Sequence, residues 1–178
     1  MNSPEEQNLI QAMVEKKIVK KGDFTLKSGE KSDTYINIKE INNYSNILAD
    51  CCNLLYKNFK PLFTNVNICG IPYGGIPIAT LLCNLNSSAL ILLRKEQKNH
   101  GLNTLVEGTQ EKEIVLIEDV VTTGSSIKES CAILETNGYK IKHIFSIIYR
   151  GTDSGITSIG GYPYNFLFKL DDILHYIK

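Results

Sequence analysis

Residues 114–126, IVLIEDVVTTGSS, decide the fold of this 178-residue chain. Four apolar residues, mostly β-branched, predict a buried strand that ends at Ile117, and two acids, Glu118 and Asp119, follow it at once. A Thr/Gly/Ser turn then opens a segment with helical spacing. In an α/β sheet, ligands bind where the carboxyl end of a strand meets the next helix. The stretch therefore predicts a strand, a ligand-binding loop and the start of a helix.

The two acids limit what this loop can bind. Backbone amides at the start of a helix hold phosphate, but Glu118 and Asp119 would repel a bare anion. The ligand is therefore expected to present hydroxyls or a metal ion to the acids, and a phosphate to Thr122 through Ser126. A phosphorylated sugar meets both demands. The chain has neither G-x-x-x-x-G-K-[ST] nor a G-x-G-x-x-G turn after a strand, so nucleotide hydrolysis and dinucleotide binding lose their main support.

Strand and helix patterns alternate along the rest of the chain. Helical apolar spacing is found at residues 4–18, 46–59, 77 onward and 126–137, and Asp171 is expected to cap a short final helix with Ile173, Leu174 and Ile177. Strand patterns are found at residues 66–71, 89–93, 144–149 and 166–170, with two short strands between 22 and 39. Ser126 and Glu129 have capping-box spacing. The alternation predicts an α/β fold with a mainly parallel, doubly wound sheet and helices on both faces.

Length and composition fit a single globular domain without a highly charged surface. Hydrophobic residues make up 43% and charged residues 21%, and the 19 basic and 19 acidic residues cancel, so neither a nucleic-acid nor a membrane partner is expected. The acidic start, MNSPEEQ, does not resemble a signal peptide, and a cytoplasmic protein is expected. The five cysteines lie in apolar segments without metal-ligand spacing, which predicts buried free thiols.

Residues 94–108, RKEQKNHGLNTLVEG, predict a long loop. The stretch is basic at its start and poor in apolar residues, so a core element is not expected there, and loops of this length are often lids. Four residues would present positive charge to a polyanion: Arg94, Lys95, Lys98 and His100. A solvated charged loop is the alternative reading of the same residues. Likewise, spacing alone favours a solvated turn lysine at Lys27, in LKSG.

The stretch 114–126 resembles the phosphoribosyl pyrophosphate signature of type I phosphoribosyltransferases. Three further stretches resemble orotate phosphoribosyltransferases in particular. FTLKSGEKSDTYIN at 24–37 is similar to their substrate-binding amino-terminal stretch, GIPYGGIPIAT at 70–80 to their pyrophosphate loop, and 94–108 to their flexible catalytic loop. The resemblance runs in order from about residue 22 to 150. It is strongest to the orotate phosphoribosyltransferase half of eukaryotic bifunctional uridine monophosphate synthase.

The resemblance implies a type I phosphoribosyltransferase fold and one reaction. Residues 1–178 would form one domain, with about 41–150 as the core and about 1–40 plus the C-terminal segment as a small hood. The reaction would transfer ribose 5-phosphate from phosphoribosyl pyrophosphate to orotate, giving orotidine 5-monophosphate and pyrophosphate. Mg²⁺ would be held mainly by the donor, with Asp119 and Glu118 nearby and no dedicated protein ligands.

The resemblance also implies roles for individual residues. Catalytic roles fall to Lys98, as the main lid catalyst, and to Asp119, Lys27 and His100. The donor would be bound by Lys27, Tyr73, Gly74, Arg94, Lys95, Lys98, His100, Glu118, Asp119, Val120, Val121, Thr122, Thr123, Gly124, Ser125 and Ser126. Orotate would be bound by Lys27, Tyr35, Ile36, Thr122 and Arg150. Lid residues would be shared between the subunits of a homodimer, and a separate orotidine monophosphate decarboxylase is a candidate partner.

The chain departs from the family pattern at three positions. Gly74 stands where bacterial forms carry a lysine, so backbone amides would have to bind pyrophosphate there. Lys39 stands where the bifunctional type has an arginine, which puts a bidentate contact in doubt. Ile36 replaces an aromatic residue of the bacterial pattern, so aliphatic packing would replace ring stacking.

Two alternatives remain open at the level of sequence. The stretch 114–126 also serves phosphoribosyltransferases for purines or uracil, and a regulator could keep the fold to sense phosphoribosyl pyrophosphate, even on RNA. The LKSG stretch and Arg150 favour orotate, because an orotate site must neutralise a carboxylate. The basic lid and the balanced net charge argue against a nucleic-acid regulator.

Overall fold

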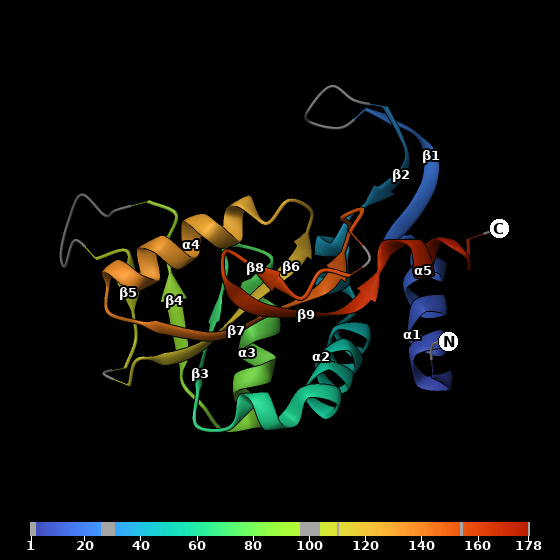
Figure 1. The fold of residues 1–178 in the computed structure, drawn as a ribbon. Coiled ribbons are helices and arrows are strands. Elements are labelled where there is room, and N and C mark those ends of the chain that lie inside the picture. The colour runs from blue at the N-terminus through green and yellow to red at the C-terminus, as the bar shows by residue number, and fades with distance from the viewer. Residues whose placement is uncertain (1–2, 26–30, 97–103, 110, 154, 178) are drawn as a thin grey trace.

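A computed structural model describes residues 3–25, 31–96, 104–109, 111–153 and 155–177. Its main sheet has seven strands in the order β5-β4-β3-β6-β7-β9-β8 (Figure 1). The strands are β3 (Asn67–Gly70), β4 (Leu90–Leu93), β5 (Val106–Glu107), β6 (Glu113–Val121), β7 (Lys140–Tyr149), β8 (Ser158–Ile159) and β9 (Tyr162–Lys169). The five central strands, β4, β3, β6, β7 and β9, pair in parallel. The short edge strands pair antiparallel, β5 with β4 and β8 with β9. The predicted, mainly parallel sheet is confirmed.

Helices cover both faces of this sheet. The helices are α1 (Pro4–Glu15), α2 (Ser45–Phe59), α3 (Gly75–Asn86), α4 (Ser125–Thr136) and α5 (Leu170–Leu174), with 3-10 turns η1 (Ile38–Asn43) and η2 (Lys60–Phe63). Alternate residues of β6 point to opposite faces: Val115 and Ile117 join the buried cluster of α1, α2 and α3, while Ile114 and Leu116 join that of α4. The predicted doubly wound arrangement is confirmed.

Three local predictions were wrong, and each has a physical reason. The strand of the opening motif does not stop before the acids, because pairing with β7 continues to Val121. The stretch 94–108 contains a short element, β5, since Val106 is buried and pairs with Leu93. Ser126 and Glu129 form no capping box: α4 begins at Ser125 after Gly124, and the Ser126 hydroxyl donates to the Glu118 carboxylate at 2.9 Å instead.

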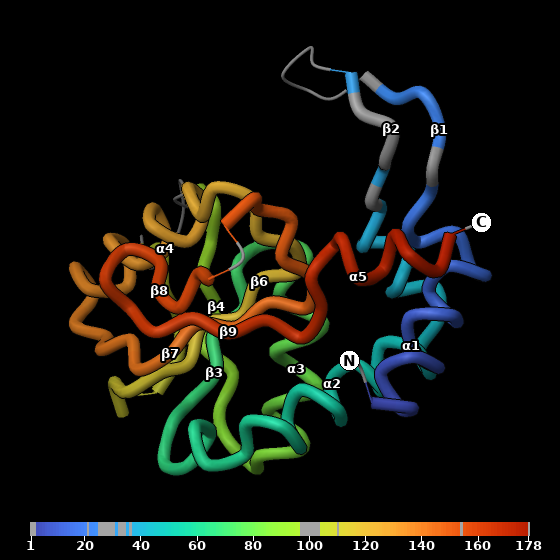
Figure 2. The backbone as a smooth tube through the Cα atoms, turned by 45° about the vertical axis from the view of Figure 1, so that its right-hand side comes forward, coloured from blue at the N-terminus to red at the C-terminus, as the bar shows by residue number. Residues whose placement is uncertain are grey.

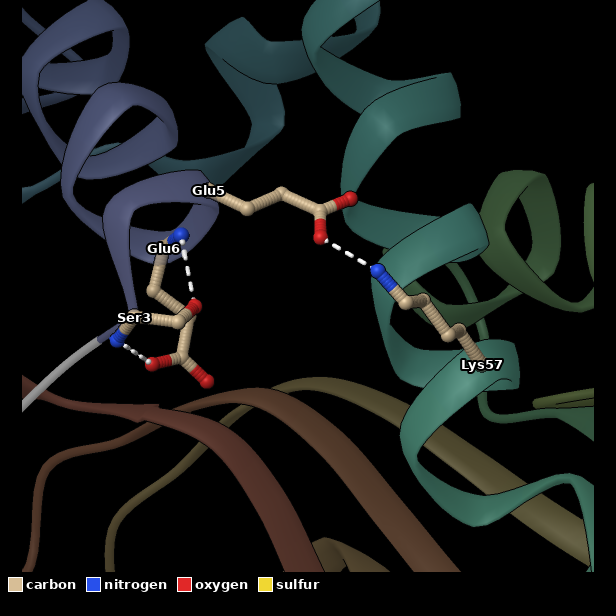
Figure 3. Close-up of polar contacts among 4 residues, drawn as sticks. All are labelled: Ser3, Glu5, Glu6 and Lys57. Atoms are coloured by element: carbon tan, nitrogen blue, oxygen red, sulfur yellow. Dashed lines mark hydrogen bonds and ion pairs between the residues drawn. The ribbon is translucent and has the colours of Figure 1, made fainter.

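The amino-terminal helix α1 is capped as its sequence suggests and packs into the core. The Ser3 hydroxyl accepts from the Glu6 amide at 3.2 Å and the Ser3 amide donates to the Glu6 carboxylate at 2.7 Å, which completes a capping box (Figure 3). Lys57 of α2 pairs with Glu5 at 2.6 Å. Both of these charges are exposed, so this pair contributes little, and the burial of Ile10 and Met13 holds the helix.

A separate two-stranded antiparallel sheet joins β1 (Val19–Thr25) to β2 (Lys31–Ile36). This hairpin rises on the side toward which the parallel strands run (Figure 1). At its base, α5 lies beside α1, as Figure 2 shows from a second direction. The hairpin therefore stands over the carboxyl edge of the main sheet, which is where the sequence places the ligand.

The remaining predictions concern thiols and membranes. All five cysteines are buried and free, as predicted, and burial raises the pKa of the Cys52 and Cys69 thiols to about 12. Among the helices that the structure describes, none is both long and apolar enough to cross a membrane.

Candidate functional site

Four sequence stretches meet at the carboxyl edge of the sheet. Their strands β4, β3, β6 and β7 are neighbours and parallel, so their carboxyl ends lie side by side. Tyr73 and Gly74 follow β3, and Arg94 follows β4. Glu118 and Asp119 lie near the end of β6, and Arg150 follows β7, where its amide donates to the Val121 carbonyl at 2.7 Å. The structure brings together residues that the sequence separates by up to 77 positions.

The acid pair differs in exposure and in hydrogen bonding. Glu118 is 6% exposed, and both of its carboxylate oxygens accept hydrogen bonds, from the Ser126 hydroxyl at 2.9 Å and from the Asp119 amide at 3.1 Å. Asp119 is half-buried, and one of its oxygens accepts from the Val120 amide at 2.8 Å. Glu118 is thus tied to α4, while Asp119 is the more accessible acid.

Burial gives Glu118 an unusual proton affinity. Desolvation is the largest cause, followed by the hydrogen bond and the negative charge of Asp119, and together they raise the pKa of Glu118 from 4.5 to about 8. The hydrogen bonds from the Asp119 amide and from Ser126 act in the opposite direction. In the ligand-free protein Glu118 therefore keeps its proton to a higher pH than an exposed glutamate does. A bound cation would favour its ionised form.

A pair of buried hydroxyls lies in the sheet beside the acid pair. Ser146 pairs with Glu118 across β6 and β7 and is fully buried, and its hydroxyl contacts that of Tyr164 on β9 at 2.6 Å. Burial raises the pKa of Tyr164, and the nearby Glu118 charge adds to this effect. Sequence reasoning missed both residues. A signal for Ser146 exists, since it interrupts the apolar strand IFSIIY.

The turn after β3 contacts the acid pair directly. A Cβ atom built on Gly74 would lie 1.9 Å from Asp119 Oδ2, so a side chain at this position would require the Asp119 carboxylate to move. The Ile71 amide donates to the Ile117 carbonyl at 2.8 Å and fixes the turn against β6. In the structure described here, the turn at Gly74 therefore lies directly against the Asp119 carboxylate.

The loop from Thr122 to Ser126 has the features of a phosphate site. The side chains of Thr122, Thr123 and Ser125 are exposed, and the Thr123 and Ser125 hydroxyls lie 2.9 Å apart. Gly124 takes the position before the helix with φ of 75°, and the first amides of the 12-residue α4 lack intrahelical acceptors. Val121, which directly precedes this loop, was also predicted to bind the donor. Its side chain is buried, so it supports the loop from within the core.

The base of the predicted lid is ordered by side-chain contacts. Arg94 Nε donates to Glu107 Oε1 at 3.0 Å, so β5 and the end of β4 are joined by an ion pair that sequence reasoning missed. Lys95 Nζ lies 4.8 Å from the centre of the exposed Tyr73 ring. The predicted lid residues Lys98 and His100 lie outside the described residues, as does Lys27.

Two cavities adjoin this lid base, and a third lies elsewhere. Those at the lid base, of about 450 and 340 Å³, share Pro72, Arg94 and Lys95, and the larger reaches Ser126 of α4. A cavity of about 770 Å³ is larger but lies at the opposite edge, where β3 and β6 begin. We place the functional site at the carboxyl edge, because the acid pair and the helix start are there.

The predicted acceptor residues come from two parts of the structure. Tyr35 is 40% exposed on β2, and its ring stacks on Phe24 with centroids 5.2 Å apart. Arg150 is half-buried at the end of β7. The side chain of Ile36 is not among those described. Tyr35 therefore belongs to the hairpin and Arg150 to the main sheet.

The oxygen donors of the site suit a hard cation. No group of three or more His, Cys, Asp or Glu residues that could hold a metal occurs within the described ranges. Glu118 and Asp119 offer two carboxylates, a donor set that suits Mg²⁺ when a ligand supplies the remaining oxygens.

Comparison with known proteins places this geometry in a family. The profile of the phosphoribosyl transferase domain matches residues 37–155, about two thirds of the chain. This chain belongs to the phosphoribosyltransferase family. The matched residues include the turn after β3, the acid pair, the phosphate-type loop and Arg150, so the described site lies within the family domain.

Individual phosphoribosyltransferases are similar over most of this chain. An orotate phosphoribosyltransferase of Pyrococcus horikoshii is 33% identical over 145 residues, which cover 80% of this chain and 78% of that protein. A uridine 5'-monophosphate synthase of Bos taurus is 31% identical over 146 residues, and the match spans only 30% of its length. The crystal structure of an Aeropyrum pernix orotate phosphoribosyltransferase superposes with a TM-score of 0.79 at 28% identity, covering 94% of this chain and 96% of that chain.

The pKa of Glu118 makes the stability of this phosphoribosyltransferase depend on pH. Between pH 4.5 and about 8 the folded protein keeps a proton that the unfolded chain has lost. This contribution to stability is therefore complete below pH 4.5 and is lost as the pH rises through about 8. Glu118→Gln, which stays neutral, is expected to flatten the fall of Tm across this window in thermal unfolding experiments.

Glu129→Gln provides the matched control, because Glu129 is an exposed carboxylate on α4. It should keep the wild-type dependence of Tm on pH. Identical profiles for the wild type and Glu118→Gln would contradict the raised pKa.

Proposed function

We propose that this chain is an orotate phosphoribosyltransferase, which transfers ribose 5-phosphate from phosphoribosyl pyrophosphate to orotate in UMP biosynthesis. One observation carries the proposal: the acid pair, the hydroxyl-rich loop and the glycine turn meet at one sheet edge in a chain of this family. The orotate phosphoribosyltransferase relatives support it, because they match most of this chain and most of their own length.

Each part of the donor has a counterpart at this edge. The 5-phosphate would accept hydrogen bonds from the first amides of α4 and from the hydroxyls of Thr123 and Ser125. The ribose hydroxyls would donate to Asp119, with Glu118 beside it. The pyrophosphate would lie against the amides of the turn at Tyr73 and Gly74. Gly74 lets the pyrophosphate-binding turn touch the ribose-binding acid, as a single extended donor requires.

The reaction breaks the bond between C1 of ribose and the pyrophosphate oxygen, and orotate nitrogen takes its place. Positive charge grows on the sugar and negative charge on the leaving group, so cationic side chains near the pyrophosphate stabilise the transition state. Lys98, Lys27 and His100 are assigned this role, with Arg94 and Lys95 at the lid base. Mg²⁺ bound with the donor, near Asp119 and Glu118, would neutralise further charge. Orotate is already an anion and needs little help from a base: its ring nitrogen gives up its proton as the bond to C1 forms, and the departing pyrophosphate can accept that proton.

The acceptor would lie between the hood and the main sheet. In this proposal the β1–β2 hairpin and the C-terminal segment form the hood over a core of about residues 41–150. Tyr35 and Ile36 would flank the pyrimidine ring, with Lys27 and Thr122 beside it. Arg150 would pair with the orotate carboxylate, which uracil lacks.

Partners and location are part of the same proposal. The exposed apolar side chains of Tyr73 and Leu92, 66% and 38% exposed at the lid base, support a homodimer in which subunits share lid residues. Light scattering should then give twice the monomer mass, and a monomer at micromolar concentration would exclude it. An orotidine monophosphate decarboxylase is a further proposed partner, because the chain is similar to part of a uridine 5'-monophosphate synthase. A cytoplasmic enzyme agrees with its composition.

The acceptor is tested by direct competition among bases. The protein is mixed with Mg²⁺ and phosphoribosyl pyrophosphate, and orotate, uracil, hypoxanthine or adenine is supplied in turn while pyrophosphate release is followed. Release with orotate alone is expected. Use of a purine but not orotate would assign a different base, and binding of the donor without any turnover would favour a sensor.

Arg150→Ala tests how orotate is recognised. A hydrogen bond between charged groups contributes about 1.5–3 kcal/mol, so KM for orotate is expected to rise by roughly tenfold to a hundredfold. KM for phosphoribosyl pyrophosphate should stay within about twofold, because Arg150 does not contact the donor in this proposal. Arg150→Lys, which keeps the charge but not the planar fork, should fall between the two. Equal increases in both KM values would refute the assignment.

A further inference from the structure

The β8–β9 hairpin packs against the phosphate-type loop, residues Thr122 to Ser126, through a contact at Gly124. Its residue Ile159 is only 5% exposed and belongs to the buried cluster on the α4 face of the sheet. A Cβ atom built on Gly124 would lie 2.7 Å from Ile159 Cγ2 and 3.5 Å from its Cδ1. The Ile159 side chain therefore fills the space beside the Cα atom of Gly124, the residue that precedes α4.

The same hairpin is fixed to α4 beyond this contact. Tyr162, which pairs with Ile159 across the hairpin, donates its hydroxyl to the carboxylate of Glu135 in the last turn of α4. Between these points, Lys128 Cγ would lie 3.5 Å from a Cβ atom on Gly160. Gly160 and Gly161 both have positive φ, which fits a tight two-residue turn. The hairpin thus follows α4 from its first residue to its last turn.

The loop depends on such packing because its own residues face outward. Gly124 has no side chain to cap the helix, and Thr122, Thr123 and Ser125 are exposed. A glycine also has the greatest freedom to leave its folded conformation. A loop already held in its binding conformation spares the ligand the cost of ordering it.

We infer that Ile159 is a positioning residue for the phosphate-binding loop, acting through its Cγ2 methyl group on Gly124. This inference rests on the proposed function, in which the loop holds the 5-phosphate of the donor. Ile159 does not touch the ligand. It fixes the Cα position of Gly124, and thereby the direction in which the amides that follow Gly124 point.

Two substitutions separate this contact from general packing. Ile159→Val keeps the methyl group on Cβ that faces Gly124 and removes one distal carbon. Ile159→Leu keeps all the carbons but moves the branch away from Cβ. Packing volume alone predicts that Leu is the milder change, whereas the positioning role predicts that Val is.

The measurements are KM for both substrates, kcat, and the Kd of ribose 5-phosphate by calorimetry, with Tm as a check on folding. Ile159→Leu is expected to raise KM for phosphoribosyl pyrophosphate and Kd for ribose 5-phosphate by about tenfold, since small displacements of binding groups are costly. Its kcat and KM for orotate should change by less than about twofold. Ile159→Val should stay within about twofold of wild type throughout.

Ile141→Leu is the control, because Ile141 is buried in the same cluster but lies at the start of β7. It should lower Tm without changing the affinity for ribose 5-phosphate. The inference is overturned if the Leu and Val variants at position 159 bind ribose 5-phosphate with equal Kd. It is also overturned if Ile159→Leu raises KM for orotate as much as KM for phosphoribosyl pyrophosphate. A wild-type protein that binds ribose 5-phosphate but does not use orotate would refute the proposed function alone. A wild type that fails to bind ribose 5-phosphate would refute both.

Discussion

The turn from β3 into α3 passes so close to β6 that a side chain at Gly75 would collide with the backbone of β6. A Cβ atom on Gly75 would lie 2.3 Å from the Ile117 carbonyl oxygen, and one on Gly74 would meet Asp119. The Ile71 amide donates to the same carbonyl and holds the turn in place. Backbone contact at Gly75 and Ile71 therefore sets the distance between the turn and β6, and the Asp119 carboxylate then lies against Gly74.

The buried acid beside this turn is costly for the free protein. Glu118 is removed from water next to a second carboxylate, so its ionised form is disfavoured, and the Ser126 hydroxyl and the Asp119 amide compensate only in part. Such an arrangement does not improve folding. It is typical of functional sites, where a ligand supplies the missing hydroxyls or positive charge.

The sequence predicted the fold and the place of the site, but not the contacts that shape it. Apolar periodicity located the main strands and helices, because burial on one or two faces leaves a local pattern. The capping box at Ser126 was predicted from local spacing and failed, since the Ser126 hydroxyl donates instead to Glu118, eight residues earlier on β6. The role of Ile159 has no local signal either, because its partner Gly124 lies 35 residues earlier and meets it only through tertiary packing.

A contact between side chains that lie far apart in the sequence could not be predicted either. The ion pair between Arg94 and Glu107 joins the two ends of the stretch 94–108. No local pattern at either residue predicts that the two side chains meet. The predicted roles of Lys27, Lys98 and His100 remain predictions, because these residues lie outside the described ranges. The local patterns do predict the order of the strands and helices along the chain. In a parallel sheet, that order places the loops after β3, β4, β6 and β7 at the carboxyl edge.

The β1–β2 hairpin shares no strand pairing with the seven-stranded sheet. Substitutions or insertions in it therefore leave the register of β6 with its neighbours undisturbed. Such a partition would let the contacts of the hairpin with the base change over evolutionary time, while Arg150 and the contacts with the sugar phosphate, which belong to the main sheet, stay as they are. The small sheet is in this sense the part of the protein that is free to diversify.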